Sequence, residues 1–69
     1  MNTIICHYED FYGCTYVLRN HPNGTADLSV RLPQGDLYLA KTYSTWRGAR
    51  IAVGRISEGT ARLTCRKEN

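Results

Sequence analysis

The sequence has no apolar run that approaches the roughly 18 residues needed by a membrane-spanning helix. Its first residues, MNTIICHYEDF, carry neither the basic segment nor the apolar segment of a secretory signal. We therefore expect a soluble protein that stays in the cytoplasm and has no contact with a membrane.

Motifs for catalysis are also missing. There is no glycine-rich phosphate loop and no Gly-x-Ser-x-Gly turn to present a catalytic serine. A chain of 69 residues buries only about 60% of the surface that its unfolded form exposes, which leaves little room for an enclosed active site. We expect a single domain over residues 1–69 that is not an enzyme and has no cofactor.

Cysteines are few, odd in number and irregularly spaced, which is more typical of a reducing compartment than of a disulfide framework. Cys6, Cys14 and Cys65 could be combined on paper with His7 and His21 into a zinc site. Structural zinc ligands usually come in close pairs, and this spacing does not match. We expect free thiols, mostly buried, and no metal.

Basic residues are concentrated in the second part of the chain. Residues 1–40 hold two basic and four acidic residues, whereas residues 41–69 hold seven basic and two acidic ones. A solvated charged surface is the commoner explanation of such a pattern. The alternative is an electropositive surface that attracts an acidic partner or a nucleic acid.

Apolar and polar residues alternate in several short segments, as they do in strands that are covered on one face. The clearest case places Ala26, Leu28, Val30 and Leu32 on one side of a strand. The turn signals HPNG and PQGD separate such segments, because proline and glycine favour tight turns. The predicted strands cover residues 3–8, 14–20, 25–32 and 37–43.

The spacing of apolar residues changes in KTYSTWRGARIAVGRI, residues 41–56, where they recur every three or four residues instead of every two. This pattern predicts a helix that begins after an N-cap at Ser44 or Thr45 and stops near Gly59. Two interior glycines weaken the helix signal unless close packing requires them. The expected core face consists of Trp46, Ala49, Ala52, Val53 and Ile56.

Alternation returns in residues 60–66, which predict a last strand with Ala61, Leu63 and Cys65 inward and with Arg62 and Arg66 outward. The order of elements is therefore β-β-β-β-α-β. We expect an α+β fold: a single antiparallel four- to five-stranded sheet with one helix packed on one face.

Aromatic residues exceed what one face of such a thin sheet can bury. Phe11 and Tyr12 either close the core or form a contact patch, and Tyr38 is expected to face outward if Leu37 and Leu39 face the helix. Exposed tyrosines beside arginines suit protein binding or the stacking of nucleic-acid bases. The candidate partner-binding residues are Arg47, Arg50, Arg55, Tyr38, Tyr43 and Arg62.

The segment AKTYSTWRGARIAV, after two hairpins, resembles small proteins of phages and lambdoid prophages, among which anti-CRISPR proteins are similar in size and in having a sheet with one helix. The resemblance implies a virus-derived binding protein that acts in the cytoplasm of a bacterial host cell. Its expected partner is a bacterial host protein or a protein–nucleic-acid complex, which it inhibits by steric blocking through a basic and aromatic surface. The alternatives are direct binding of nucleic acid, or a prophage protein that only dimerises; the chain is expected to be a monomer or a homodimer.

Overall fold

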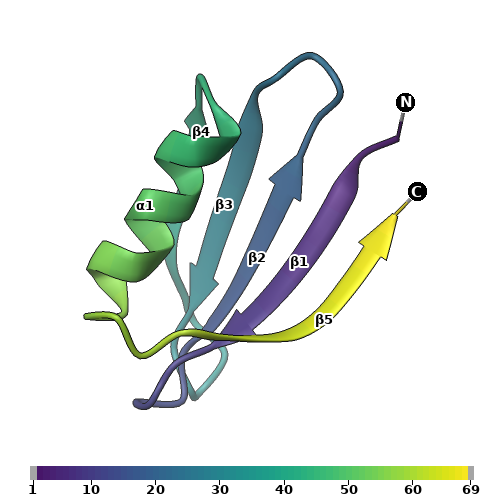
Figure 1. Cartoon of the computed structure of the whole chain (residues 1–69). Helices are drawn as coiled ribbons and strands as arrows, with labels where there is room; N and C mark the ends of the chain where they lie inside the picture. The colour runs from purple at the N-terminus through teal and green to yellow at the C-terminus, as the bar shows by residue number, and fades with distance from the viewer. Residues whose placement is uncertain (1, 69) are drawn as a thin grey trace.

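A computed structural model describes residues 2–68, which form a five-stranded antiparallel sheet with one helix across one of its faces (Figure 1). This arrangement confirms the predicted α+β fold and its β-β-β-β-α-β order. No helix in the described range is long and apolar enough to cross a membrane. The elements are β1 (Ile4–Glu9), β2 (Thr15–Asn20), β3 (Ala26–Arg31), β4 (Leu37–Tyr43), α1 (Trp46–Ile56) and β5 (Arg62–Glu68).

The sheet has the strand order β4-β3-β2-β1-β5. The first four strands form a meander, because each pairs with the strand that follows it in the chain. The chain then crosses the sheet through α1, so that β5 pairs with β1 at the opposite edge. Both edge strands, β4 and β5, therefore belong to the C-terminal half of the sequence.

The three hairpins use one type of turn. In each, the first residue of the turn donates its N–H to the carbonyl of the fifth, and a glycine in fourth position donates to the carbonyl of the first. These glycines have φ values of 86°, 94° and 100° at Gly13, Gly24 and Gly35, a region that side chains disfavour. HPNG and PQGD are confirmed as turns, and residues 10–14 form a third one without proline.

The core lies between α1 and the middle of the sheet. Tyr16 and Leu18 from β2, together with Leu28 and Val30 from β3, are each 1% exposed. The helix covers β2, β3 and β4. The predicted core face of the helix is confirmed, since Ala49 and Val53 are buried and the other three residues pack against this core: Trp46, Ala52 and Ile56.

The ends of α1 follow the sequence signals. Thr45 is the N-cap, and its side-chain oxygen accepts a hydrogen bond from the N–H of Gly48 at 2.9 Å. After the helix, Gly59 takes a φ of 78° and donates to the carbonyl of Gly54 at 2.8 Å. This bond satisfies one of the last carbonyls of the helix, as expected for a glycine that ends a helix.

The two glycines inside α1 stand in different surroundings, which gives a matched pair of variants. A methyl group added at Gly54 would meet nothing within 4 Å, whereas one added at Gly48 would lie 3.0 Å from the Thr45 cap oxygen. Gly54→Ala is expected to raise the free energy of unfolding by about 0.5–1 kcal/mol, because alanine is the better helix former. Urea unfolding followed by circular dichroism measures this change.

Gly48→Ala is the control, and it should give no gain because the added methyl group would crowd the N-cap. Equal stabilisation by both substitutions would show that the contact with Thr45 has no energetic weight.

The structure corrects the predicted faces of the last strand. Leu63 pairs with Tyr8, Cys65 with His7 and Arg66 with Cys6, so the register shifts by one residue at a β-bulge. An extra residue in one strand reverses the alternation beyond it. Leu63 and Arg66 therefore share the helix side of the sheet, and Cys65 lies on the other side, contrary to the prediction for Cys65 and Arg66.

A second register shift, between Val30 and Arg31, affects the start of β4. Leu39 packs against the core as predicted, whereas Leu37 pairs with Arg31 and is 54% exposed. The condition on which the outward position of Tyr38 was predicted, that both leucines face the helix, therefore does not hold for Leu37. Lys41 pairs with Leu28, on the helix side, and its ammonium lies 5.1 Å from the centre of the Tyr43 ring.

The three cysteines are free, as expected, but only one of them is buried. Cys6 is part of the core, Cys14 is partly buried and Cys65 is exposed. The expectation of mostly buried thiols is wrong for Cys65, because the bulge turns it away from the helix and α1 covers neither β5 nor the opposite face.

Candidate functional site

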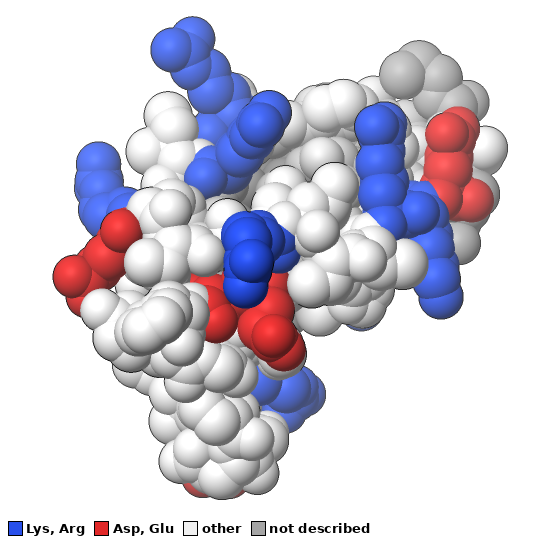
Figure 2. Space-filling model, turned by 60° about the horizontal axis from the view of Figure 1, so that its bottom comes forward, with Lys and Arg blue, Asp and Glu red and all other residues white. Residues whose placement is uncertain are grey.

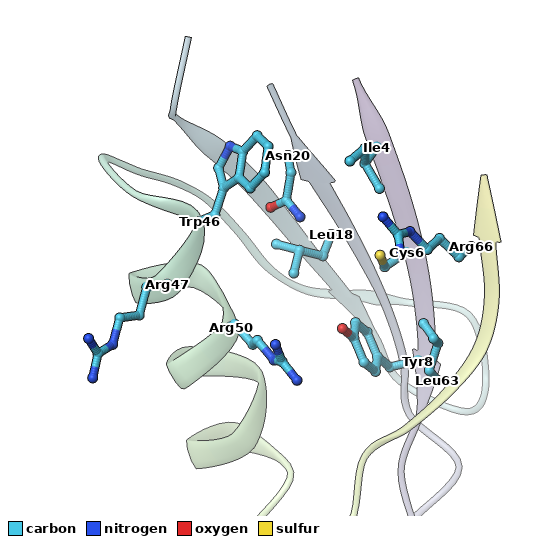
Figure 3. Close-up of a pocket in the computed structure, with 10 residues that line it drawn as sticks. All are labelled: Ile4, Cys6, Tyr8, Leu18, Asn20, Trp46, Arg47, Arg50, Leu63 and Arg66. Atoms are coloured by element: carbon cyan, nitrogen blue, oxygen red, sulfur yellow. The ribbon is translucent and has the colours of Figure 1, made fainter. Parts of the chain in front are cut away.

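The helix covers only three of the five strands, so β1 and β5 are left open beside it on the same face. Figure 3 shows the resulting hollow, which has a volume of about 480 Å³. We call it the arginine groove. Its lining includes Ile4, Tyr8, Asn20, Arg50, Leu63 and Arg66.

Two arginines enter the arginine groove from opposite sides. Arg50 extends from α1 toward Tyr8, while the side chain of Arg66 runs from β5 back over the sheet toward Cys6 (Figure 3). Burial and the Cys6 thiol raise the pKa of Tyr8, whereas the charges of Arg50 and Arg66 act in the opposite direction. Both guanidinium groups are therefore within electrostatic reach of the Tyr8 hydroxyl.

Arg47 contributes to the arginine groove differently from the sequence prediction. Arg47 and Arg50 are three residues apart in the sequence, about one helical turn, and both are candidate partner-binding residues. In Figure 3 the guanidinium of Arg47 points away from the sheet, and that of Arg50 points toward it. Arg50 is instead grouped with Arg66, a residue of the basic C-terminal half that was expected to face outward.

The end of the arginine groove near Trp46 holds a polar atom without a partner. The side-chain oxygen of Asn20 is buried and accepts no hydrogen bond from any described residue. Leaving such an acceptor unpaired costs about 1–3 kcal/mol. Because this oxygen has almost no solvent-exposed surface, the unpaired acceptor is an internal cost of the fold and offers no contact to a molecule in the groove.

A second candidate surface lies at the end of the sheet where the β1–β2 and β3–β4 turns meet. Phe11 is 82% exposed and Tyr12 is 57% exposed, and their rings pack edge to face with centroids 5.7 Å apart. Of the two sequence alternatives for this pair, closure of the core is wrong. The pair stands in solvent at a hairpin tip.

Asp10 holds this turn in place. One of its carboxylate oxygens accepts hydrogen bonds from the N–H groups of Tyr12 and Cys14, both at 2.9 Å. The other oxygen accepts from the hydroxyl of Tyr16 at 2.7 Å, and Tyr16 is itself in the core. Asp10, which is only 7% exposed, therefore connects the turn that carries the exposed aromatic pair to the core.

The ionisation of Asp10 follows from these contacts. Burial alone would raise its pKa, but the hydrogen bonds from Tyr16, Cys14 and Tyr12 outweigh this effect, and the pKa lies below the ordinary value. Burial, and then the hydrogen bond to Asp10, raise the pKa of Tyr16. Asp10 is thus a carboxylate and Tyr16 a neutral donor at neutral pH.

The turn is also tied to the segment that follows the helix. The N–H of Phe11 donates to the side-chain oxygen of Thr60 at 3.1 Å, and the Thr60 hydroxyl donates to the carbonyl of Ser57 at 2.7 Å. On its other side, Gly13 lies against Pro33 of the β3–β4 turn. Phe11 and Tyr12 are consequently presented by a braced turn.

Leu37 and Tyr38, at the start of β4, belong to the same end of the sheet, and they are 54% and 62% exposed. Figure 2 turns this end toward the viewer, and it shows uncharged surface over much of the lower half of the molecule. We call this surface the aromatic end. It consists of Phe11, Tyr12, Leu37 and Tyr38.

The structure separates the six residues that the sequence singled out. Arg50 lies in the arginine groove, Arg47 lies at its margin, and Tyr38 belongs to the aromatic end. Tyr43, also a candidate partner-binding residue, is partly buried against the core on the helix side and lines neither surface. The two remaining residues are exposed but line neither surface: Arg55 and Arg62.

The basic residues are not continuous on the face that Figure 2 shows. Lys and Arg side chains project there at several separate places, and Asp and Glu side chains lie between them. On this face, the concentration of basic residues in the second part of the sequence therefore does not become one continuous positive surface. This distribution fits local pairing with acidic groups better than tracking of a long phosphate backbone.

Among residues 2–68, no three His, Cys, Asp or Glu side chains are grouped so that they could hold a metal ion. The five residues considered for zinc in the sequence are dispersed, since His7 and Cys65 lie on the face opposite Cys6 and His21 pairs with Asp27 at 2.8 Å. Comparison of the chain with protein-family models, with curated proteins and with solved structures gave no match.

Proposed function

We propose that this protein acts by binding another protein through the aromatic end. The observation that carries the proposal is that four of the six large apolar side chains exposed in the described chain lie at one end of the sheet. Grouped apolar surface of this kind is typical of interaction sites, and tyrosine and phenylalanine are enriched in them.

The support of the turn strengthens the proposal. Asp10 and Thr60 fix the backbone that carries Phe11 and Tyr12, so little conformational entropy would be lost when the two rings enter a pocket of a partner. A standard interface covers about 800 Å² of each partner. On a molecule with 4663 Å² of surface, such an interface would take up about one-sixth and would extend over the whole end.

The effect on the partner, in this proposal, is steric. An interface of this area would cover part of the partner's surface with the rigid end of the sheet. Such a blocked surface is what the phage-like resemblance implies, namely an inhibitor of a bacterial defence or regulatory protein. The direct nucleic-acid binder is the alternative. It predicts affinity that falls with the logarithm of salt concentration at a slope of roughly −4 to −5 for about five phosphate contacts.

Replacing Phe11 and Tyr12 together by serine is expected to lower capture of a partner from a bacterial lysate at least tenfold, because aromatic anchors carry much of the energy of an interface. The variant should unfold within about 0.5 kcal/mol of the parent, since both side chains are exposed. Quantitative mass spectrometry of the captured proteins and urea unfolding provide the two measurements.

Ile51→Ser is the matched control, because Ile51 is 51% exposed on α1 and stands outside both surfaces. Its capture should equal that of the parent. Unchanged capture by the Phe11 and Tyr12 variant would contradict the proposal, and co-purification of nucleic acid with the expected salt slope would favour the alternative.

A further inference from the structure

The arginine groove is a vacant position in the helix layer of the fold. The helix α1 covers β2, β3 and β4, whereas no described element covers β1 and β5 on that side. Apolar side chains of both strands are left there, among them Ile4 and Leu63. Such a half-covered sheet face gains stability when a further element is added to the layer.

The dimensions of this position match one helix. Two neighbouring strands, each about 4.8 Å wide, give a floor about 10 Å across, and an α-helix with its side chains is about 10 Å in diameter. Six or seven residues of strand extend for about 20 Å, which equals about 14 residues of helix at 1.5 Å each. The wall formed by α1 allows the usual contact between parallel or antiparallel helices.

The charged residues around the arginine groove indicate the chemistry of the helix that would bind there. Arg50 reaches over the floor from the α1 side and Arg66 reaches over it from the β5 side, so both guanidinium groups are available to an occupant from opposite sides. Glu68, opposite Ile4 at the end of β5, is the acidic residue that shares this face of the two strands. A helix that enters here would meet arginines along its flanks and apolar side chains beneath it.

We propose that the arginine groove binds an acidic amphipathic helix of a partner protein, with the apolar stripe of the helix on β1 and β5 and its carboxylates on Arg50 and Arg66. Arginine suits this role because its guanidinium can form two parallel hydrogen bonds with one carboxylate. Recognition of this kind is the helix-in-groove mode of peptide binding.

This site is separate from the aromatic end, so the two proposals can fail independently. Trp46, the one tryptophan of the sequence, lines the arginine groove and reports on its occupancy by fluorescence. The probe is a 14-residue peptide without tryptophan, in which leucines recur at helical spacing and glutamates flank them. Two further peptides serve as controls: one has lysine in place of every glutamate, and one has the same composition in scrambled order.

The acidic peptide is expected to change the Trp46 emission in a saturable manner and to gain helical circular dichroism on binding. Arg50→Glu and Arg66→Glu should each weaken this binding at least tenfold, and the double variant should bind the lysine peptide instead. Arg55→Glu alters the net charge equally but lies outside the arginine groove, so it should leave the affinity within twofold of the parent.

Several results would overturn the proposal. These are absence of binding, equal binding of the scrambled peptide, and equal weakening by Arg55→Glu. An eight-nucleotide oligothymidine that gives the same Arg50-dependent emission change would assign the groove to phosphate groups. A dimer in light scattering that Arg50→Glu and Arg66→Glu dissociate would assign it to a second copy of the chain.

Discussion

Replacing Asp10 by alanine is expected to lower the free energy of unfolding by about 3 kcal/mol or more. The substitution removes three hydrogen bonds to a carboxylate, and it leaves the hydroxyl of Tyr16 without an acceptor in the core. Hydrogen bonds to charged groups contribute about 1.5–3 kcal/mol each, and an unpaired buried donor costs about 1–3 kcal/mol. Because a domain of 69 residues has a total stability of roughly 3–10 kcal/mol, the loss would be a large fraction of it.

The pH dependence of stability tests the same contact. The pKa of Asp10 is lower in the folded than in the unfolded chain, so its stabilising effect is fully present above the unfolded pKa and is lost as pH falls through the folded one. Asp27 acts in the same direction, because hydrogen bonds from His21 and Thr42 lower its pKa. Stability should therefore fall below about pH 4.

Asp10→Asn separates the charge from the shape of the side chain. The amide oxygen can still accept from the two backbone N–H groups, so the cost should be smaller than for alanine, about 1–2 kcal/mol. The acid-induced loss of stability should also be shallower than in the parent. Asp36→Ala is the control, because Asp36 lies on an exposed turn, and its free energy of unfolding should stay within about 0.5 kcal/mol of the parent. Equal effects of the Asp10 and Asp36 substitutions would contradict this account.

The second large effect is expected for Trp46→Ala, which should lower the free energy of unfolding by about 2–4 kcal/mol. Trp46 packs on the core from the first turn of α1, and its indole N–H donates to the carbonyl of His21 at 2.9 Å. The substitution removes apolar contacts and one of the two hydrogen bonds that the carbonyl of His21 accepts, since the N–H of Gly24 still donates to it. Chemical unfolding followed by far-ultraviolet circular dichroism gives the change without the need for tryptophan fluorescence.

Trp46→Phe distinguishes the two contributions. It retains most of the apolar area and loses the hydrogen bond, so about 1 kcal/mol is expected. Ile51→Ala, on the exposed side of the same helix, controls for a general effect on α1. If the phenylalanine variant is as unstable as the alanine variant, packing of the indole contributes little and this explanation is wrong.

The arginine groove and the aromatic end depend on different contacts within the fold. The aromatic end depends on Asp10, which fixes a turn, whereas the arginine groove depends on the pairing of β5 with β1, which places Arg66 across from Arg50. Charge reversal at Arg50 should therefore leave the binding at the aromatic end unchanged. A protein with both surfaces could contact two segments of one partner, which would raise the overall affinity through effective concentration.

The local features of the fold could be predicted from the sequence. Alternation in residues 26–31 identified a strand with one buried face, the spacing of apolar residues identified α1, and glycine with proline identified two of the turns. These features depend on side chains that are neighbours in the chain, because a strand repeats every two residues and a helix every 3.6. Tyr38 is exposed, but the alternation does not account for it, because the register shift at the start of β4 breaks the condition that Leu37 and Leu39 both face the helix.

The sequence pattern did not predict the roles of residues that act through contacts with distant parts of the chain. The sequence around Asp10 gave no sign of a structural role, yet its carboxylate joins a turn to Tyr16. Phe11 and Tyr12 had two possible placements, and their exposure depends on how Asp10 and Thr60 hold the turn. One signal was present in the sequence, since Gly13 stands at the fourth position of its turn, as Gly24 and Gly35 do in the other two hairpins.

The sequence alone thus determined the elements, their order and the face that each presents in an unbroken strand or helix. Tertiary structure decided which strand lies beside β1, and with it the existence of the arginine groove. It also decided, through the bulge in β5, that Arg66 enters this groove and Cys65 leaves the helix side. The physical reason is that periodicity is local, whereas strand pairing and register are set by contacts between residues far apart in the chain.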